Sequence, residues 1–311
     1  MTTVEPFSIS RVFDAPRKLV YQANIDPAHL SKWMGAAGYE PIFSAMDFRV
    51  GGSYRYGLRA PDGSTMWGKQ VYREIVPDER LVLLQSFSDE HGGLARHPMA
   101  PTWPLQMLST TTFEDAPGGK TKMTVSWAPY EADDAANATF DAARAGMKQG
   151  FGGTFAKLDA HLAATACQLM TSRVVDAPRE LVWKAFTDPA HVNAWWGPDG
   201  FQNVDVEQDV RVGGAWKFKM VGPDGVVYPN KATYLELQPP ARLVYDHGDW
   251  DRVHFRAEIT LDELANGKTL VTLSLTLPSR EARDGVVGYA IDGGRQTLAK
   301  LAVHVAGMAS A

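Results

Sequence analysis

The sequence predicts an α+β fold that is built twice, as two tandem domains in one chain of 311 residues. Three observations carry this prediction: a long internal repeat, a series of β-branched segments separated by turn residues, and an amphipathic helix at the end of each repeat. The expected order in each domain is one strand, two short helices, a meander of antiparallel strands and one long C-terminal helix. This order favours a curved antiparallel sheet wrapped around the long helix, because both must bury an apolar face.

The repeat is visible in short motifs that recur at a constant spacing. Asp-Pro-Ala-His at 26–29 returns at 188–191, and Arg-Val-Gly-Gly at 49–52 returns at 211–214. Both pairs are 162 residues apart. A period of this length indicates tandem globular domains and not a solenoid of short repeats. We place the first domain at 1–163 and the second at 168–311.

Each repeat begins with a strand followed by two short helices. In the second copy a β-branched segment at 169–175 is followed by Asp-Ala-Pro, whose proline restricts the residue before it. The next segment places Val182, Ala185 and Phe186 on one helical face. The pair Asp188-Pro189 then predicts the start of a second helix, because aspartate caps helices and proline favours their first turn.

The middle of each repeat is a series of strands joined by turns such as Pro-Asp-Gly and Asn-Gly. The last strand has apolar residues at 271, 273, 275 and 277 with Thr or Ser between them, so one of its faces is apolar. The strands predicted in the second copy are 201–206, 215–220, 226–237, 242–247, 254–262 and 268–277.

A long helix closes each repeat. Its buried stripe in the second copy follows the i, i+3, i+4, i+7 spacing and consists of Leu298, Leu301, Ala302 and Val305. The first copy repeats the stripe with Phe151, Phe155, Leu158 and Leu162. In the first copy the segment 147–153 is rich in glycine, which predicts a bend or hinge in that helix.

Composition restricts the class of protein. With 45% hydrophobic and 22% charged residues, the chain has an ordinary globular composition, and it shows neither a signal-peptide pattern nor an apolar run long enough for a membrane span. A formal charge of -5 and the lack of a Lys/Arg block argue against nucleic acid or an anionic membrane as the partner. A single cysteine, Cys167, cannot form an internal disulfide, so we expect a cytoplasmic location.

The second copy resembles a known family. Its segment 176–191 reads DAPRELVWKAFTDPAH, and Trp-Trp-Gly-Pro at 195–198, Arg-Val-Gly-Gly and the terminal helix follow. Together these motifs resemble the Hsp90-ATPase-activator-homologue branch of the START-like (SRPBCC, helix-grip) superfamily, and the resemblance covers both copies. The first copy departs from the pattern with Trp-Met-Gly-Ala at 33–36 and with a 14-residue insertion near 88–104 that contains His91, His97 and Trp103.

The resemblance implies two helix-grip domains, each with a hydrophobic cavity between the sheet and the long helix. The implied ligand is an apolar or aromatic small molecule. The insertion near 88–104 would then form a lid over the mouth of the first cavity.

Aromatic side chains are the first ligand-binding candidates, because flat rings stack on flat ligands. Filling of the core is the alternative role for any of the nine tryptophans. Trp127 is favoured, because its repeat partner is Leu275 on the inward face of the last strand, so the two cavities would differ. The candidate ligand-binding residues are Trp33, Trp67, Trp103, Trp127, Phe151, Trp196, Trp216, Tyr228, Trp250 and Arg295, the last as an anchor for a carboxylate or phenolate.

The catalytic candidates lie mainly near the turn that follows the strand 242–247. His247 with Asp249 or Asp251 could form a base and its orienting carboxylate, and adding His254 would give a metal set. A solvated hairpin is the alternative, because Asp is common in turns. Tyr289 near the start of the long helix completes the set, which is His247, Asp249 and Tyr289.

Motifs for nucleotide, flavin, zinc-protease and serine-hydrolase chemistry are missing from the sequence. We therefore predict no cofactor and no metal. Three functions stay open: binding of a hydrophobic or aromatic small molecule for sequestration, protection or sensing; a cofactor-independent cyclase, hydrolase or lyase acting on an aromatic or carbonyl substrate; and regulation of a chaperone ATPase, which would need a protein partner.

Overall fold

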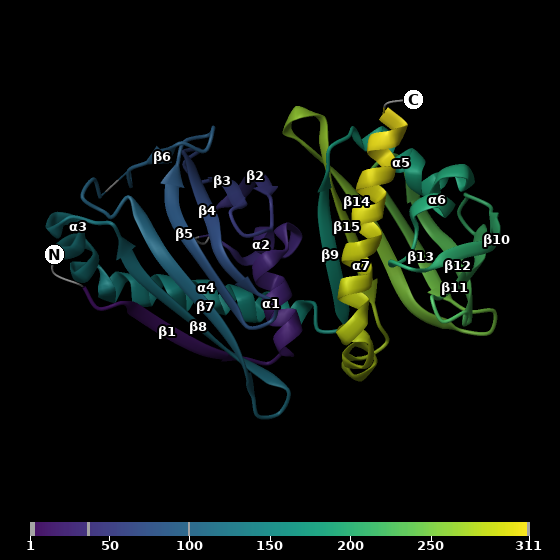
Figure 1. Ribbon diagram of the computed structural model, residues 1–311, viewed down its shortest axis with the longest axis horizontal. Coiled ribbons are helices and arrows are strands. Elements are labelled where there is room, and N and C mark those ends of the chain that lie inside the picture. The colour runs from purple at the N-terminus through teal and green to yellow at the C-terminus, as the bar shows by residue number, and fades with distance from the viewer. Residues whose placement is uncertain (1–3, 36–37, 99, 310–311) are drawn as a thin grey trace. The chain divides into compact units, whose positions relative to one another are not determined.

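The computed structural model describes residues 4–35, 38–98 and 100–309. The chain divides into two units, Met1–Ala164 and Thr165–Ala311, each with its own sheet and long helix (Figure 1). Among the described residues, no helix combines the length and the apolar character that crossing a membrane requires.

The first domain contains one antiparallel sheet with the strand order β1-β8-β7-β5-β4-β3-β2, and β6 pairs with β5. Two short helices follow the first strand and two helices follow the last. The elements are β1 (Phe7–Phe13), α1 (Arg17–Ile25), α2 (Pro27–Trp33), β2 (Glu40–Met46), β3 (Ser53–Arg59), β4 (Thr65–Val76), β5 (Arg80–Ser88), β6 (Leu94–Ala95), β7 (Gln106–Ala116), β8 (Lys120–Tyr130), α3 (Asp134–Ala142) and α4 (Arg144–Ala164).

The second domain repeats this plan with the strand order β10-β11-β12-β13-β14-β15-β9. Its long helix α7 lies across the sheet of its own domain (Figure 1). The elements are β9 (Gln168–Val175), α5 (Arg179–Thr187), α6 (Pro189–Trp195), β10 (Gln202–Gln208), β11 (Ala215–Val221), β12 (Val227–Gln238), β13 (Arg242–Gly248), β14 (Val253–Leu264), the 3₁₀ turn η1 (Ala265–Gly267), β15 (Lys268–Thr276) and α7 (Arg280–Ala309). The predicted helix-grip fold is confirmed in both domains.

The paired short helices are fixed in the same way in both domains. The side chain of Asp26 accepts a hydrogen bond from the backbone N–H of Ala28 at 2.9 Å, and the side chain of Asp188 caps α6 in the same way. The indole Nε1 of Trp33 donates to the carbonyl of Ala23 at 2.9 Å, which ties the end of α2 back to α1. Trp195 makes the corresponding bond in the second domain.

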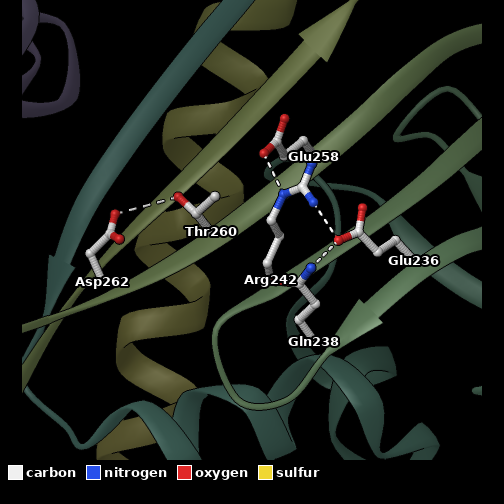
Figure 2. A network of polar contacts seen from close by, with 6 residues as sticks. All are labelled: Glu236, Gln238, Arg242, Glu258, Thr260 and Asp262. Atoms are coloured by element: carbon white, nitrogen blue, oxygen red, sulfur yellow. Dashed lines mark hydrogen bonds and ion pairs between the residues drawn. The ribbon is translucent and has the colours of Figure 1, made fainter.

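The core of each domain lies between the sheet and the long helix. The predicted helical stripes point into it, because α4 buries Phe155, Leu158 and Leu162, and α7 buries Leu298, Leu301 and Val305. The opposite face of the second sheet is polar. Figure 2 shows Arg242 on that face, where it donates to Glu258 at 2.7 Å and to Glu236 at 2.5 Å.

The backbone of α4 is helical through the glycine-rich segment 147–153, so the expected bend or hinge does not interrupt the helix there. The interruption lies earlier, at Ala143, between α3 and α4. The buried side chain of Phe140 explains the turn, because it directs α3 into a separate apolar cluster with Trp103 and Met107. In the second domain α7 is continuous from Arg280 to Ala309.

Candidate functional site

Each domain has a cavity between its sheet and its long helix. The first cavity has a volume of about 380 Å³, and within the described ranges none of its lining residues is Asp, Glu, His, Lys or Arg. Its polar groups are amides, hydroxyls and the phenol of Tyr56, whose pKa is raised to about 12 by burial. The apolar lining includes Trp33, Met34, Leu58, Met66, Met123, Val125, Trp127, Phe151 and Phe155.

Two aromatic side chains narrow the first cavity from opposite sides. Trp127 on β8 donates from Nε1 to the hydroxyl of Ser109 at 3.0 Å, which fixes its ring against the sheet. Phe151 on α4 meets that ring edge-on, with centroids 4.7 Å apart, and also stacks on Phe7. The predicted ligand-binding residues Trp33, Trp127 and Phe151 therefore line one cavity.

The second cavity is larger, with a volume of about 880 Å³. Trp196 and Tyr228 line it, and Tyr228 is 45% exposed at its edge. Tyr289 on α7 also lines it and is 68% exposed. A further hollow of about 420 Å³ adjoins this cavity and shares Tyr289, Leu275 and two other residues with it.

His247 is the histidine that lines the second cavity. It lies on β13, and its ring stacks on Phe255 with centroids 4.5 Å apart and planes 12° apart. Its Nδ1 atom is fully buried and has no hydrogen-bond partner within the described part of the chain. Burial, with a smaller contribution from the charge of His254, lowers the pKa of His247 to about 4. The imidazole is therefore neutral at neutral pH.

The expected pairing of His247 with Asp249 or Asp251 is wrong. Asp249 accepts hydrogen bonds from the backbone N–H groups of Asp251 and Arg252 at 2.9 and 3.0 Å, so its carboxylate closes the β13–β14 turn. The imidazole that it contacts is that of His254, at 3.1 Å. No group of three or more His, Cys, Asp or Glu suited to a metal occurs among the residues that the structure describes.

Four other predicted aromatic residues lie outside both cavity linings. Trp216 stacks on Phe218 in the buried core at 4.4 Å. Trp250 is 48% exposed beside the β13–β14 turn. The remaining two pack on phenylalanines outside the cavities: Trp67 on Phe43 and Trp103 on Phe140.

Arg295 is also absent from the cavity linings, and its guanidinium pairs with Asp292 one helical turn away, at 3.2 Å. The expected lid is not formed either. The described residues of the insertion near 88–104 contribute nothing to the lining of the first cavity. This segment packs on α3, where Thr139 donates to Thr102 at 2.9 Å.

Several lining residues were missed by the sequence analysis. Gln70 and Gln85 face the first cavity, and Thr171 and Asn230 face the second. The repeat spacing was the signal that could have found Gln85, because it lies 162 residues before His247.

The edge of each cavity is tied to the long helix by repeated contacts. Lys157 Nζ donates to the carbonyl of Gly35 at 2.7 Å, and Lys300 Nζ donates to the carbonyl of Gly197 at 3.0 Å. Both glycines line the cavities. A histidine pair accompanies each lysine, His29 with His161 at 2.7 Å and His191 with His304 at 3.2 Å.

Solved structures with a similar fold come from several bacteria. A protein of Nitrosomonas europaea is 24% identical, and the match covers 47% of this chain and 98% of that chain with a TM-score of 0.44. A protein of Chromobacterium violaceum is 32% identical over 44% of this chain and 95% of that chain, with a TM-score of 0.38. The di-domain ARO/CYC BexL of the BE-7585A biosynthetic pathway is 15% identical over 97% of this chain and 98% of that chain, with a TM-score of 0.39.

No curated protein matches the chain. A family model matches it twice, over residues 14–163 and 176–306. These two matches include the short helices, every strand of each sheet except the first, and nearly all of the long helix. The chain therefore belongs to the family described as Activator of Hsp90 ATPase homolog 1-like protein, and it carries two copies of the family's domain.

Proposed function

We propose that the protein binds hydrophobic or aromatic small molecules in its helix-grip cavities, for sequestration, protection or sensing. The observation that carries this proposal is the open space at the same place in both domains, about 380 and 880 Å³. These volumes lie in the range of small-molecule sites, whereas a packed protein core leaves few voids larger than a water molecule.

The chemistry of the linings favours binding over catalysis. The first cavity is lined by apolar side chains and neutral polar groups. In the second, His247 contacts Phe255 and not a carboxylate, and its pKa is about 4. A general base is most effective when its pKa lies near the working pH and a third group orients it. His247 meets neither condition.

A cofactor-independent cyclase, hydrolase or lyase is the second candidate function. The observation that favours it is that His247, Tyr245 and Tyr289 all line one cavity, where a carbonyl or aromatic substrate would contact them. Burial raises the pKa of Tyr245, so this phenol stays protonated and able to donate a hydrogen bond. Regulation of a chaperone ATPase, which the family description suggests, stays a prediction.

Native mass spectrometry of the full chain with a panel of aromatic compounds tests these alternatives. Binding predicts an adduct of unchanged compound mass, which Leu275→Trp weakens by filling the second cavity, while the exposed Trp250→Leu leaves it unchanged. Catalysis predicts a product that differs from the compound in mass or, for a ring closure that conserves mass, in chromatographic retention, and that disappears in His247→Phe. Absence of any adduct or product would contradict both functions.

A further inference from the structure

One polar position recurs in the two cavities, on the central strand of each sheet. His247 pairs across the sheet with Ala232 on one side and Phe255 on the other. Gln85 occupies the same position in the first domain. The two positions differ in their cross-strand neighbours, because Gln85 pairs with Gln70, which is polar and also lines the cavity. Cross-strand neighbours thus leave His247 without a polar group beside it.

The surroundings of the His247 ring indicate which nitrogen carries the proton. Among the described residues Nδ1 has no hydrogen-bond partner and is fully buried, whereas Nε2 is not closed off in this way. A buried N–H without an acceptor is costly and rare in proteins, so the neutral ring places its proton on Nε2. The stack on Phe255 fixes the plane of the ring, and the side chain lines the cavity. Nε2–H is therefore a hydrogen-bond donor that has no acceptor among the described residues, and a ligand in the cavity can provide one.

We propose that Nε2–H of His247 makes the second cavity selective for flat aromatic ligands that carry a carbonyl oxygen, such as aromatic ketones and quinones. This inference rests on the proposed binding function and names its ligand class. A carbonyl oxygen accepts a hydrogen bond without needing a positive charge. The described lining contains no Lys or Arg that would balance the charge of an anion, so a neutral acceptor fits better.

The test compares 9-fluorenone with fluorene, because the two compounds have nearly the same flat shape and differ in one carbonyl group. Equilibrium dialysis of the full chain gives the affinity for each, and the ratio of the two affinities is the readout. We expect this ratio to fall about tenfold in His247→Phe, which keeps a ring beside Phe255 and removes the donor. His247→Gln should retain most of the ratio, because glutamine restores an N–H donor.

Two controls locate the effect. Leu275→Trp should weaken binding of both compounds if they occupy the second cavity. Trp250→Leu, at an exposed position outside both cavity linings, should leave the ratio unchanged. Circular dichroism of each variant verifies that it is folded.

The outcomes are distinguishable. An equal ratio in the wild type, His247→Phe and His247→Gln, with both compounds bound, would overturn the selectivity and leave the binding function standing. Failure of the wild type to bind either compound would overturn the binding function and the selectivity with it.

Discussion

The two domains share a scaffold and differ at the centre of their cavities. Trp127 pairs across the sheet with Phe7 and Ser109, and Leu275 occupies the same place between Leu169 and Ala257. The larger ring of Trp127 takes up space that the Leu275 side chain leaves open. The first cavity has a volume of about 380 Å³, whereas the second has about 880 Å³. One duplicated fold thus contains a small cavity lined by apolar and neutral polar groups and a larger cavity that is also lined by a histidine.

The long helices differ at a matching position. Phe151 lies one turn before the buried Phe155, and Gly294 lies one turn before the buried Leu298. A Cβ atom at Gly294 would lie 2.6 Å from the hydroxyl oxygen of Thr171, so the missing side chain permits α7 to approach β9 closely. The two cavities therefore differ at one position on the sheet and at one position on the long helix.

The largest expected effect on ligand affinity comes from filling the second cavity. Leu275→Trp introduces the side chain that the first domain has at this position, and the added volume should displace a bound aromatic ligand. We expect at least a tenfold loss of affinity for 9-fluorenone by equilibrium dialysis. An unchanged affinity would place the ligand outside this cavity.

The converse change opens the first cavity. Trp127→Leu removes buried ring volume and the hydrogen bond to Ser109, so the first domain should lose about 2 kcal/mol of unfolding free energy. Urea unfolding followed by circular dichroism measures this loss. Trp250→Leu, at an exposed position, is the matched control and should stay within about 0.5 kcal/mol of the wild type. Equal effects of the two substitutions would contradict the packing role of Trp127.

Acid should weaken both domains through histidines whose pKa is lowered, chiefly His161 in the first domain and His247 in the second. Burial, then the nearby His29 and Lys32, lower the pKa of His161 to about 4, and His247 is lowered to about 4 as well. The unfolded chain binds these protons near pH 6.5, the ordinary histidine value, so stability is full above that pH and falls as the pH decreases from 6.5 towards 4.

Urea midpoints at pH 7.5 and pH 5 measure this dependence. His247→Gln should reduce the difference between the two midpoints, because it removes one of the histidines whose pKa is lowered. Identical midpoints at both pH values in the wild type would contradict the lowered histidine pKa values.

The smallest expected effect concerns glycines of α7. Gly285→Ala meets nothing within 4 Å and should stabilise the helix by up to about 1 kcal/mol. Gly294→Ala gains the same helix propensity but must displace Thr171, so its net effect should be zero or destabilising. Thermal unfolding of the two variants gives the comparison, and equal stabilisation would show that the helix does not depend on this close approach.

Periodicity and capping made much of the fold predictable. The stripe of Leu298, Leu301 and Val305 is buried as expected, because helical spacing brings these residues to one face. The Asp188 cap follows from local chemistry in the same way. The repeat also indicated that Trp127 replaces Leu275, which the strand register bears out.

The site was less predictable, because proximity along the chain is not contact in space. His247 and Asp249 are two residues apart, yet a register shift beside His247 and the tight turn that follows separate their roles. Gly294 carries no sequence pattern of its own. Its importance depends on how closely a helix passes a strand, and a single sequence does not encode that distance directly.

The lysine ties at the cavity edges have a consequence for exchange of ligands. Lys157 and Lys300 each hold a carbonyl of the loop that follows the second short helix, and that loop forms part of the cavity wall. A molecule that entered the cavity between the lysine and this wall would have to separate the ammonium group from its carbonyl acceptor at Gly35 or Gly197. Such charge-assisted bonds are stronger than neutral ones, so passage along this route is slowed by the same contact in both domains.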